Sequence, residues 1–394
     1  MKILISSDLI GTSKHLVFDG ESYSWSSSYD SESWVFGKRE RTFKSLEIPM
    51  EAVEHEMPVW PDPVRVKIFK QTLEKNDTTI PWHKVLGDHL FKECVQDLVD
   101  RLWLFSSKWN DTYYMQTLPL NTQLLLSLRS ALVDKSRIEK HKSSGLQSQL
   151  STFVPNDRSE IKAVVYDQFG SQTGRLTVKS GPQILTLKKE MRDIFKSRYE
   201  AGNIVEIDFT SIEPRIALKI AGDSPPKDVY NYISSQMFDS RYTRDEVKLA
   251  VLASLYGSKN IPGIDIEWSE KRQIIKSLRE KFKIKKIEED SFAQLRDFGY
   301  IQNIFGRKMT PRTDKKHVLY NNIIQSSAVD AALLGFRSLL SSITGDFTPL
   351  FIIHDAIILD LSKESLKSVM SLESIMLSTK ELEIDLPIKS KILS

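Results

Sequence analysis

The spacing of hydrophobic positions divides the chain into segments with different predicted structures. Residues 1 to about 80 mix aromatic side chains with serine, as in the run from Ser22 to Ser26, which is typical of short strands and turns. From about residue 83 to 150, apolar side chains recur every four residues, which predicts helices. Strand and helix patterns alternate from about 160 to 394. The four-residue repeat is formed by Leu90, Cys94, Leu98 and Leu102 and again by Leu124, Leu128 and Leu132, and a linker is indicated by Pro58, Pro61 and Pro63.

The composition is that of a globular protein large enough for more than one folding unit. The 394 residues are 40% hydrophobic and 27% charged. The net charge of +3 does not by itself indicate a nucleic-acid partner, so local clusters of basic residues have to carry that inference. The single cysteine, Cys94, excludes an internal disulfide and fits a reducing compartment. No run reaches the roughly 18 apolar residues of a membrane span, so we expect a cytoplasmic protein without a membrane partner.

Two aspartates stand where apolar strands are predicted to end. Residues 203–208 form an apolar run that ends at Asp208, and Asp355 lies at the predicted turn of a hairpin formed by residues 349–360. Either aspartate alone is as readily a turn or capping residue. Together they could share a pair of Mg²⁺ ions, with Mn²⁺ as a substitute, because hard divalent cations take oxygen ligands. Two ions about 4 Å apart stabilise both the attacking and the leaving oxygen of a phosphoryl displacement.

A helix is predicted to begin after Thr243, which forms a capping box with Glu246, and to end at Gly257. Four of its side chains, spaced four residues apart, follow one face of that helix. Two cations followed by an aromatic ring on one stripe could hold a triphosphate and flank its base. The same pattern also fits a solvated basic stripe with a half-buried tyrosine. The four residues are Arg244, Lys248, Leu252 and Tyr256.

Six segments of the chain resemble motifs of the family A DNA polymerases, the polymerase-I type. They lie between about residues 170 and 361, and their occurrence in family order makes the resemblance specific. The segments are Thr173-Gly174-Arg175-Leu176, Asp208-Phe209-Thr210-Ser211-Ile212-Glu213, Arg244-x3-Lys248-x7-Tyr256-Gly257, Gly299-Tyr300-x5-Gly306-Arg307, Asn321-x3-Gln325-x2-Ala328-x-Asp330 and His354-Asp355.

The resemblance implies an α/β (α+β) fold of the right-hand polymerase type, with an antiparallel palm sheet, helical fingers and a helical thumb beside the β-rich N-terminal region. It also implies a template-directed DNA polymerase that extends a primer 3′ end with dNTPs by two-metal nucleotidyl transfer, without a proofreading exonuclease. The expected segments are 1–82 of unknown role, 83–160 as the thumb, 161–220 as palm, 221–312 as fingers and 313–394 as palm.

The resemblance also assigns roles to individual residues. Asp208 and Asp355 would bind the metals, and Glu213 would lie under the incoming sugar as a steric gate against a 2′-hydroxyl. In the helix stripe, Arg244 and Lys248 would hold the triphosphate, Lys248 would take part in catalysis, Leu252 would belong to the nucleotide site and Tyr256 would lie beside the templating position. Primer or template would be contacted by Arg175, Asn321, Gln325 and His354, and the duplex would be gripped by Lys140 and Lys142 at the thumb tip.

The chain departs from the family motifs at two places. Ala356 stands where the family has glutamate after His-Asp, which puts a third acidic residue near the metals in doubt. Glu206 lies two residues before Asp208, on the same strand face, and is a hypothetical substitute. Leu252 replaces the aromatic residue that the family has four positions after the lysine. In the N-terminal region, Asp30-x-Glu32 is a weak match to an exonuclease remnant.

Two other functions remain open from the sequence. A single-subunit RNA polymerase or primase-like enzyme is favoured by Ala356 and by the run from Tyr256 to Lys259, whereas Glu213 argues for DNA synthesis. A non-enzymatic scaffold that binds primer-template junctions would have no need of Asp208 and Asp355.

The partners implied are primer-template DNA and dNTPs, together with a replication accessory protein that the N-terminal region could bind. Two basic clusters, at residues 271–286 and 188–198, are expected to contact DNA or to form solvated helix faces. The compactness and divergence of the chain suggest a phage or another mobile element, and therefore a bacterial or infected host cell.

Overall fold

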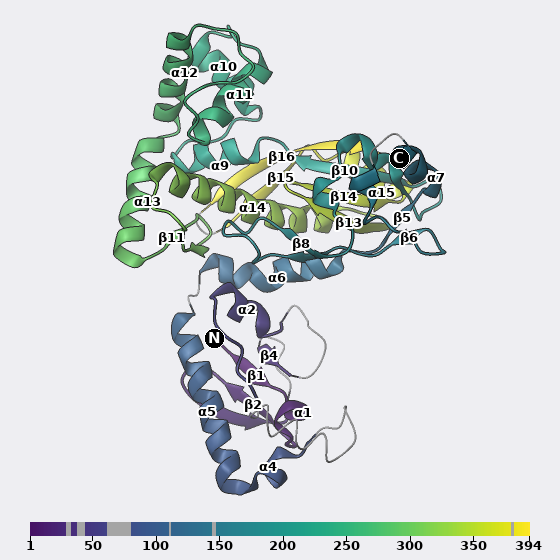
Figure 1. Ribbon diagram of the computed structural model, residues 1–394, viewed down its shortest axis with the longest axis vertical. Helices are drawn as coiled ribbons and strands as arrows, with labels where there is room; N and C mark the ends of the chain where they lie inside the picture. Colours follow the sequence, from purple (N-terminus) through teal and green to yellow (C-terminus); the bar gives the residue numbers. More distant parts are fainter. Residues whose placement is uncertain (29–32, 38–43, 61–79, 110–111, 144–146, 380–381) are drawn as a thin grey trace. The chain divides into compact units, whose positions relative to one another are not determined.

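The computed structural model describes all residues except 29–32, 38–43, 61–79, 110–111, 144–146 and 380–381. It divides into two compact units, Met1–Gln123 and Leu124–Ser394 (Figure 1). The predicted Asp30-x-Glu32 match and two of the linker prolines, Pro61 and Pro63, lie outside the described residues.

The first unit contains a four-stranded sheet in the order β3-β2-β1-β4. Strand β1 pairs antiparallel with β2 and parallel with β4, and its three residues are fully buried. The predicted β-rich character of this region is therefore confirmed. The elements are β1 (Ile3–Ile5), α1 (Ser7–Ile10), β2 (His15–Phe18), β3 (Tyr23–Ser26), β4 (Trp34–Phe36), α2 (Glu47–Ala52), α4 (Trp82–Val85) and α5 (Gly87–Lys108).

The four-residue repeat correctly predicted α5, which buries Val95, Leu98 and Leu102 along one stripe. The second repeat predicted a helix that extends as far as Leu132, and this is wrong. Helix α6 (Tyr113–Ser127) ends earlier, and Leu132 lies in strand β5 (Ala131–Val133). The boundary between the units falls inside α6 and inside the segment 83–160 expected to form the thumb. Helix α5 therefore belongs to the compact unit of the N-terminal sheet, and the thumb assignment stays a prediction.

The second unit is built on a five-stranded antiparallel sheet in the order β13-β14-β10-β16-β15. Strands β10, β13 and β14 are mostly apolar and buried, which explains their near-continuous hydrophobic sequence, whereas β15 and β16 also carry exposed polar residues. The predicted α/β fold with an antiparallel sheet is confirmed. The strands are β10 (Asn203–Phe209), β13 (Phe347–Ile353), β14 (Ala356–Leu361), β15 (Ser374–Ser378) and β16 (Glu383–Ile392).

Helix α14 (Lys316–Ser342) is the core helix of the second unit and packs against α9, α13 and β15. A Cβ added to Gly335 would lie 2.7 Å from the ring of Phe209, so glycine is needed where the helix approaches the sheet. There Phe336 stacks on Phe209 with ring centroids 5.0 Å apart. The helix is long and apolar enough to cross a membrane, but 72% of its apolar window is buried in the protein, as in a core helix.

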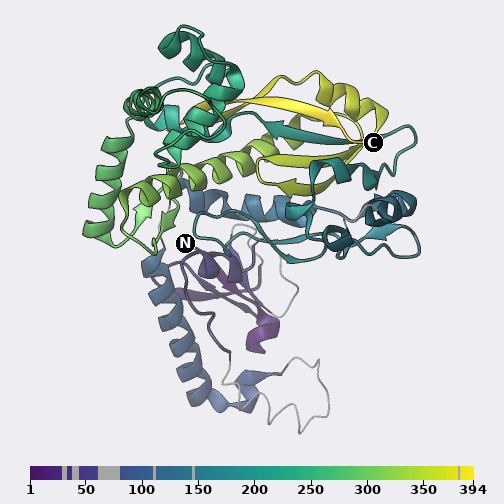
Figure 2. The same cartoon turned by 45° about the horizontal axis from the view of Figure 1, so that its top comes forward.

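A group of helices lies beyond one end of this sheet (Figure 1, Figure 2). It contains α10 (Val229–Phe238), α11 (Arg244–Leu255) and α12 (Trp268–Lys281), and α13 (Ile284–Phe298) leads back toward the sheet. The other elements of the second unit are α7 (Lys135–His141), α8 (Gln147–Leu150), β6 (Glu160–Ile161), β7 (Val165–Asp167), β8 (Thr177–Ser180), η2 (Ile184–Thr186), η3 (Lys189–Ile194), β9 (Phe195–Lys196), α9 (Ile212–Ile220), β11 (Ile301–Gln302), β12 (Lys308–Met309) and α15 (Lys363–Met370).

Candidate active site

The two aspartates predicted to bind metal are brought together by strand pairing. Strand β10 pairs with β14 in a register that sets Asp208 opposite Ala356, the residue that follows Asp355. The N–H of Phe209 donates to the carbonyl of Asp355 at 3.1 Å. Strands β13 and β14 form the predicted hairpin, and its turn places His354 in the left-handed backbone region at φ 56°. Strand pairing therefore places the two carboxylates at the same end of neighbouring strands, although they are about 150 residues apart in the sequence.

The carboxyl groups of Asp208 and Asp355 both have raised pKa values, so they lose their protons less readily than free carboxyl groups do. Burial, with Asp355 as the next cause, raises the pKa of Asp208 to about 7. Burial likewise raises the pKa of Asp355, with Glu213 adding to the effect. Lys189 and Lys248 act in the opposite direction on the pKa of Asp208. A bound cation would stabilise both ionised carboxylates, so the site is electrostatically prepared for positive charge.

The donor set fits Mg²⁺, which takes oxygen ligands, keeps several waters and is completed by substrate phosphates. Among the residues that the structure describes, no group of three or more His, Cys, Asp or Glu side chains is placed to hold a metal. The pair Asp208 and Asp355 is smaller than such a group, and their assignment as metal ligands stays a prediction.

The contacts of Glu206 argue against the hypothesis that it replaces the missing acidic residue. The Glu206 carboxylate is buried and bonds to the guanidinium of Arg192, and the Lys189 ammonium lies 3.7 Å away. Glu206 is absent from the residues that line the cavity at Asp208 and Asp355. Its charge is neutralised inside the protein instead of being directed toward a metal.

The predicted cationic stripe faces the same cavity, which has a volume of about 640 Å³. Helix α11 begins with the predicted capping box between Thr243 and Glu246, and Gly257, at φ 72°, follows its end. Because the four stripe residues are spaced one turn apart, they share the face that lines the cavity: Arg244, Lys248, Leu252 and Tyr256.

Arg244 has two neighbours that the sequence did not reveal. Its Nε donates to Asp228 at 2.9 Å, and its guanidinium lies 5.1 Å from the ring centroid of Tyr230. Asp228 is also the N-cap of α10 and accepts from the N–H groups of Tyr230 and Asn231. A capping signal was available in the sequence, but nothing local indicated the ion pair.

Glu213 is held by two donors. Arg175 donates from Nη2 to Oε1 at 3.1 Å, and the hydroxyl of Tyr256 donates to Oε2. Burial and the neighbouring Glu213 raise the pKa of the Tyr256 hydroxyl, so it remains a donor at neutral pH. Glu213 lies in the first turn of α9, whose N-cap Ser211 adopts a left-handed conformation. The Ser211 side chain makes no capping hydrogen bond to this helix.

Most of the predicted site residues meet in this cavity. Arg175, Glu213, Gln325 and His354 line it together with the two aspartates and the stripe of α11. Of the described residues, Asn321, Lys140 and Lys142 are outside the lining set, and Lys142 bonds to Glu139 at 2.9 Å. Sequence reasoning missed Tyr230 and Lys389, and it named Lys189 only as part of a basic cluster.

Comparisons with known proteins identify the family of the chain. No curated protein matches the chain. A structure described as the POL domain of Pol1 from M. smegmatis, in complex with DNA primer-template and dNTP, is 16% identical with a TM-score of 0.48. It is matched over 88% of this chain, and the chain spans 62% of its length. A sequence model described as DNA polymerase family A matches residues 84–393. The chain therefore belongs to DNA polymerase family A.

Proposed function

We propose that this chain is a template-directed DNA polymerase that extends a primer 3′ end with dNTPs. The observation that carries the proposal is the meeting of Asp208 and Asp355 with Arg244 and Lys248 in one cavity. Two half-buried carboxylates and two cations that line one cavity form a site suited to a metal-bound triphosphate. Membership of family A supports the same activity.

Asp208 and Asp355 would hold two Mg²⁺ ions, or Mn²⁺ in their place. When bound, the ions supply charge stabilisation for the attacking and leaving oxygens of the displacement. Lys248 projects from the second turn of α11 toward the same cavity, where its ammonium is available to the triphosphate. Arg244 would have to exchange Asp228 for phosphate oxygens, which accept stronger bidentate hydrogen bonds from a guanidinium.

Selection of dNTPs would come from Glu213. Its side chain is only 19% exposed and is fixed by Arg175 and Tyr256. A carboxylate held at both oxygens cannot turn aside for a ribose 2′-hydroxyl, so an rNTP would clash with it. This fixation favours DNA synthesis over RNA synthesis. Leu252 lines the same cavity as a smaller apolar contact for the nucleotide.

Primer and template would lie against the cavity on the side of Arg175, Gln325 and His354, with Asn321 and the thumb-tip residues Lys140 and Lys142 as more distant contacts. A second hollow of about 970 Å³ is lined by a group of basic side chains and by Trp268, which is 51% exposed. We assign it to the single-stranded template, because cations hold phosphates and an exposed ring stacks on bases. Its lining includes Lys259, Arg272, Lys276, Arg279, Lys283 and Lys286.

Two further proposals from the sequence concern the first unit. It could bind a replication accessory protein, and it would not supply proofreading. A primer with a mismatched 3′ terminus tests the second point, because an exonuclease would shorten that primer before extension. A phage origin and a bacterial or infected host cell as the setting remain part of this proposal.

The deciding experiment is primer extension with Mg²⁺, with dNTPs and rNTPs compared on primed and unprimed templates. Wild type should extend only the primed template and only with dNTPs. Asp355→Ala should abolish extension, whereas Asp265→Ala, which changes an exposed aspartate outside the cavity, should not. Extension with rNTPs would make the chain an RNA polymerase. Tight junction binding without extension would make it a scaffold.

A further inference from the structure

Gly174, in the turn that carries Arg175, lies directly on a buried arginine. A Cβ added to Gly174 would stand 2.5 Å from Cζ of Arg307, and the glycine has φ +73°. The turn is closed by the N–H of Gly174, which donates to the carbonyl of Ser171 at 3.0 Å. Glycine is thus required twice, for its backbone conformation and for the close approach of the guanidinium.

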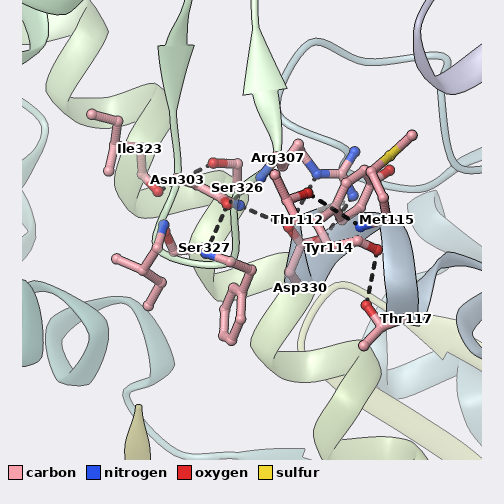
Figure 3. Close-up of polar contacts among 12 residues, drawn as sticks. Thr112, Tyr114, Met115, Thr117, Asn303, Arg307, Ile323, Ser326, Ser327 and Asp330 are labelled. Atoms are coloured by element: carbon pink, nitrogen blue, oxygen red, sulfur yellow. Dashed lines mark hydrogen bonds and ion pairs between the residues drawn. The ribbon is translucent and has the colours of Figure 1, made fainter. Parts of the chain in front are cut away.

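The Arg307 guanidinium is itself fixed from behind (Figure 3). It donates from Nε and Nη2 to the two carboxylate oxygens of Asp330, at 3.1 and 2.6 Å. Asn303 donates to the same carboxylate at 2.7 Å and accepts from the N–H of Arg307 at 2.9 Å. Asp330 is 1% exposed and Arg307 is 6% exposed. The planar group therefore has a single orientation, set by the core helix α14.

A continuous set of contacts runs from this pair to the sugar gate. Asp330 orients Arg307, the Arg307 guanidinium supports Gly174, and the next residue is Arg175. Arg175 in turn donates to Glu213 at 3.1 Å. A further hydrogen bond, from the Gln172 side chain to the carbonyl of Thr310, ties this turn to the segment that follows β12, three residues beyond Arg307.

We infer that Arg307 is a positioning residue for sugar selection: by holding the turn at Gly174, it places Arg175 so that Glu213 keeps the orientation that rejects a 2′-hydroxyl. This inference rests on the proposed polymerase function. Arg307 does not line the nucleotide cavity, so it acts through Arg175 and not on the substrate. A lysine at position 307 would retain the charge beside Asp330 but would lose the flat, two-pronged group on which the turn rests.

A double-mutant cycle tests the inference. The variants are Arg307→Lys, Arg175→Ala and the two combined, and the measured quantity is kcat/KM for a dNTP divided by kcat/KM for the matching rNTP. Arg307→Lys should lower this ratio by about tenfold or more, the value of one charge-assisted hydrogen bond. The combined variant should lower it no further than Arg175→Ala does, because both changes remove the same support from Glu213.

The matched control is Arg198→Lys, which alters an arginine that donates to the equally buried carboxylate of Asp360 in the same unit. This control should lower the melting temperature without changing the sugar ratio. Arg198 belongs to the basic cluster at residues 188–198, but any loss of DNA affinity would affect dNTP and rNTP addition alike. If Arg307→Lys does not fold, Gly174→Ala is the alternative variant. Its Cβ would displace the turn from the Arg307 guanidinium and should lower the ratio in the same way.

The inference is overturned if the effects of Arg307→Lys and Arg175→Ala multiply in the combined variant. It is equally overturned if Arg307→Lys changes only the melting temperature, as the control does. A wild-type protein that extends no primer, or that accepts rNTPs as readily as dNTPs, would instead overturn the proposed function. The two failures are therefore distinguished by the wild-type measurement.

Discussion

Removing Arg192 alone should destabilise the second unit far more than removing Arg192 and Glu206 together. Both side chains are 6% exposed and bond to each other within the protein. In the Arg192→Met variant, Glu206 would keep only Lys189, whose ammonium lies 3.7 Å away and is 66% exposed. Loss of one partner from a buried ion pair typically costs about 3–5 kcal/mol, because it leaves an uncompensated charge in the interior.

The double variant Arg192→Met/Glu206→Met removes both charges and fills the space with apolar side chains of similar length. Such replacements are often neutral, or stabilising by about 1–4 kcal/mol. Against a total unfolding free energy of about 5–15 kcal/mol, the single variant should thus lose a large share of stability that the double variant regains. The exposed pair Lys227 and Glu373, both about three-quarters exposed, is the control, and its removal should change stability by less than about 1 kcal/mol.

Urea unfolding of wild type, single, double and control variants measures these differences at an unchanged slope. Primer extension by the double variant adds a second readout, because it distinguishes a structural Glu206 from a metal ligand. We expect a stable double variant with turnover close to wild type. A double variant as unstable as the single one would refute the ion-pair reasoning. A stable double variant without turnover would restore Glu206 as the third acidic residue of the site.

Three further predictions concern the site itself. The pKa of Asp208 is raised to about 7, so below that pH a proton must leave before metal binds. The Mg²⁺ affinity of the metal-free protein, measured by titration, should therefore fall about tenfold per pH unit below 7 and level off above it. An affinity that does not change between pH 5 and 8 would contradict this. Glu213→Ala should raise rNTP incorporation relative to dNTP by about 10–200-fold in single-nucleotide kinetics, since one steric contact is lost; an unchanged ratio would exclude the gate. Arg272→Ala/Lys276→Ala should reduce the slope of log affinity against log salt for single-stranded DNA by about 1.4, whereas Lys363→Ala/Lys367→Ala on α15 should not; equal slopes in both pairs would show that the hollow at α12 does not hold the template.

Local patterns predicted the elements that hold the candidate site. The apolar run that ends at Asp208 became β10, and the apolar halves around His354 and Asp355 became the β13–β14 hairpin. The capping box at Thr243 and the glycine at 257 marked the limits of α11 within a residue or two. These signals are local because strand alternation and helix caps depend on neighbours within a few residues.

The sequence did not predict which charges neutralise one another. Glu206 is a hypothetical substitute for the missing glutamate because it shares a strand face with Asp208, yet its partner Arg192 comes from a different segment, η3. The side chains of residues two apart on a strand point to the same side of the sheet, but this does not mean that they contact the same groups. The group that each of them meets depends on what packs over that face, and spacing along one strand carries no information about it.

The same limit explains why the motifs were recognised separately although the structure joins them. The turn at Gly174, the arginine at 307 and the aspartate at 330 are spread over more than 150 residues, and each is unremarkable in its own sequence context. Their contact exists because α14 places Asp330 behind the β11–β12 segment that carries Arg307. The buried carboxylate of Asp330 requires a cationic partner, which is Arg307. The Arg307 guanidinium in turn leaves no room for a side chain at position 174. The glycine of the turn is therefore a consequence of the aspartate in the core helix, a dependence that becomes visible only when burial is known.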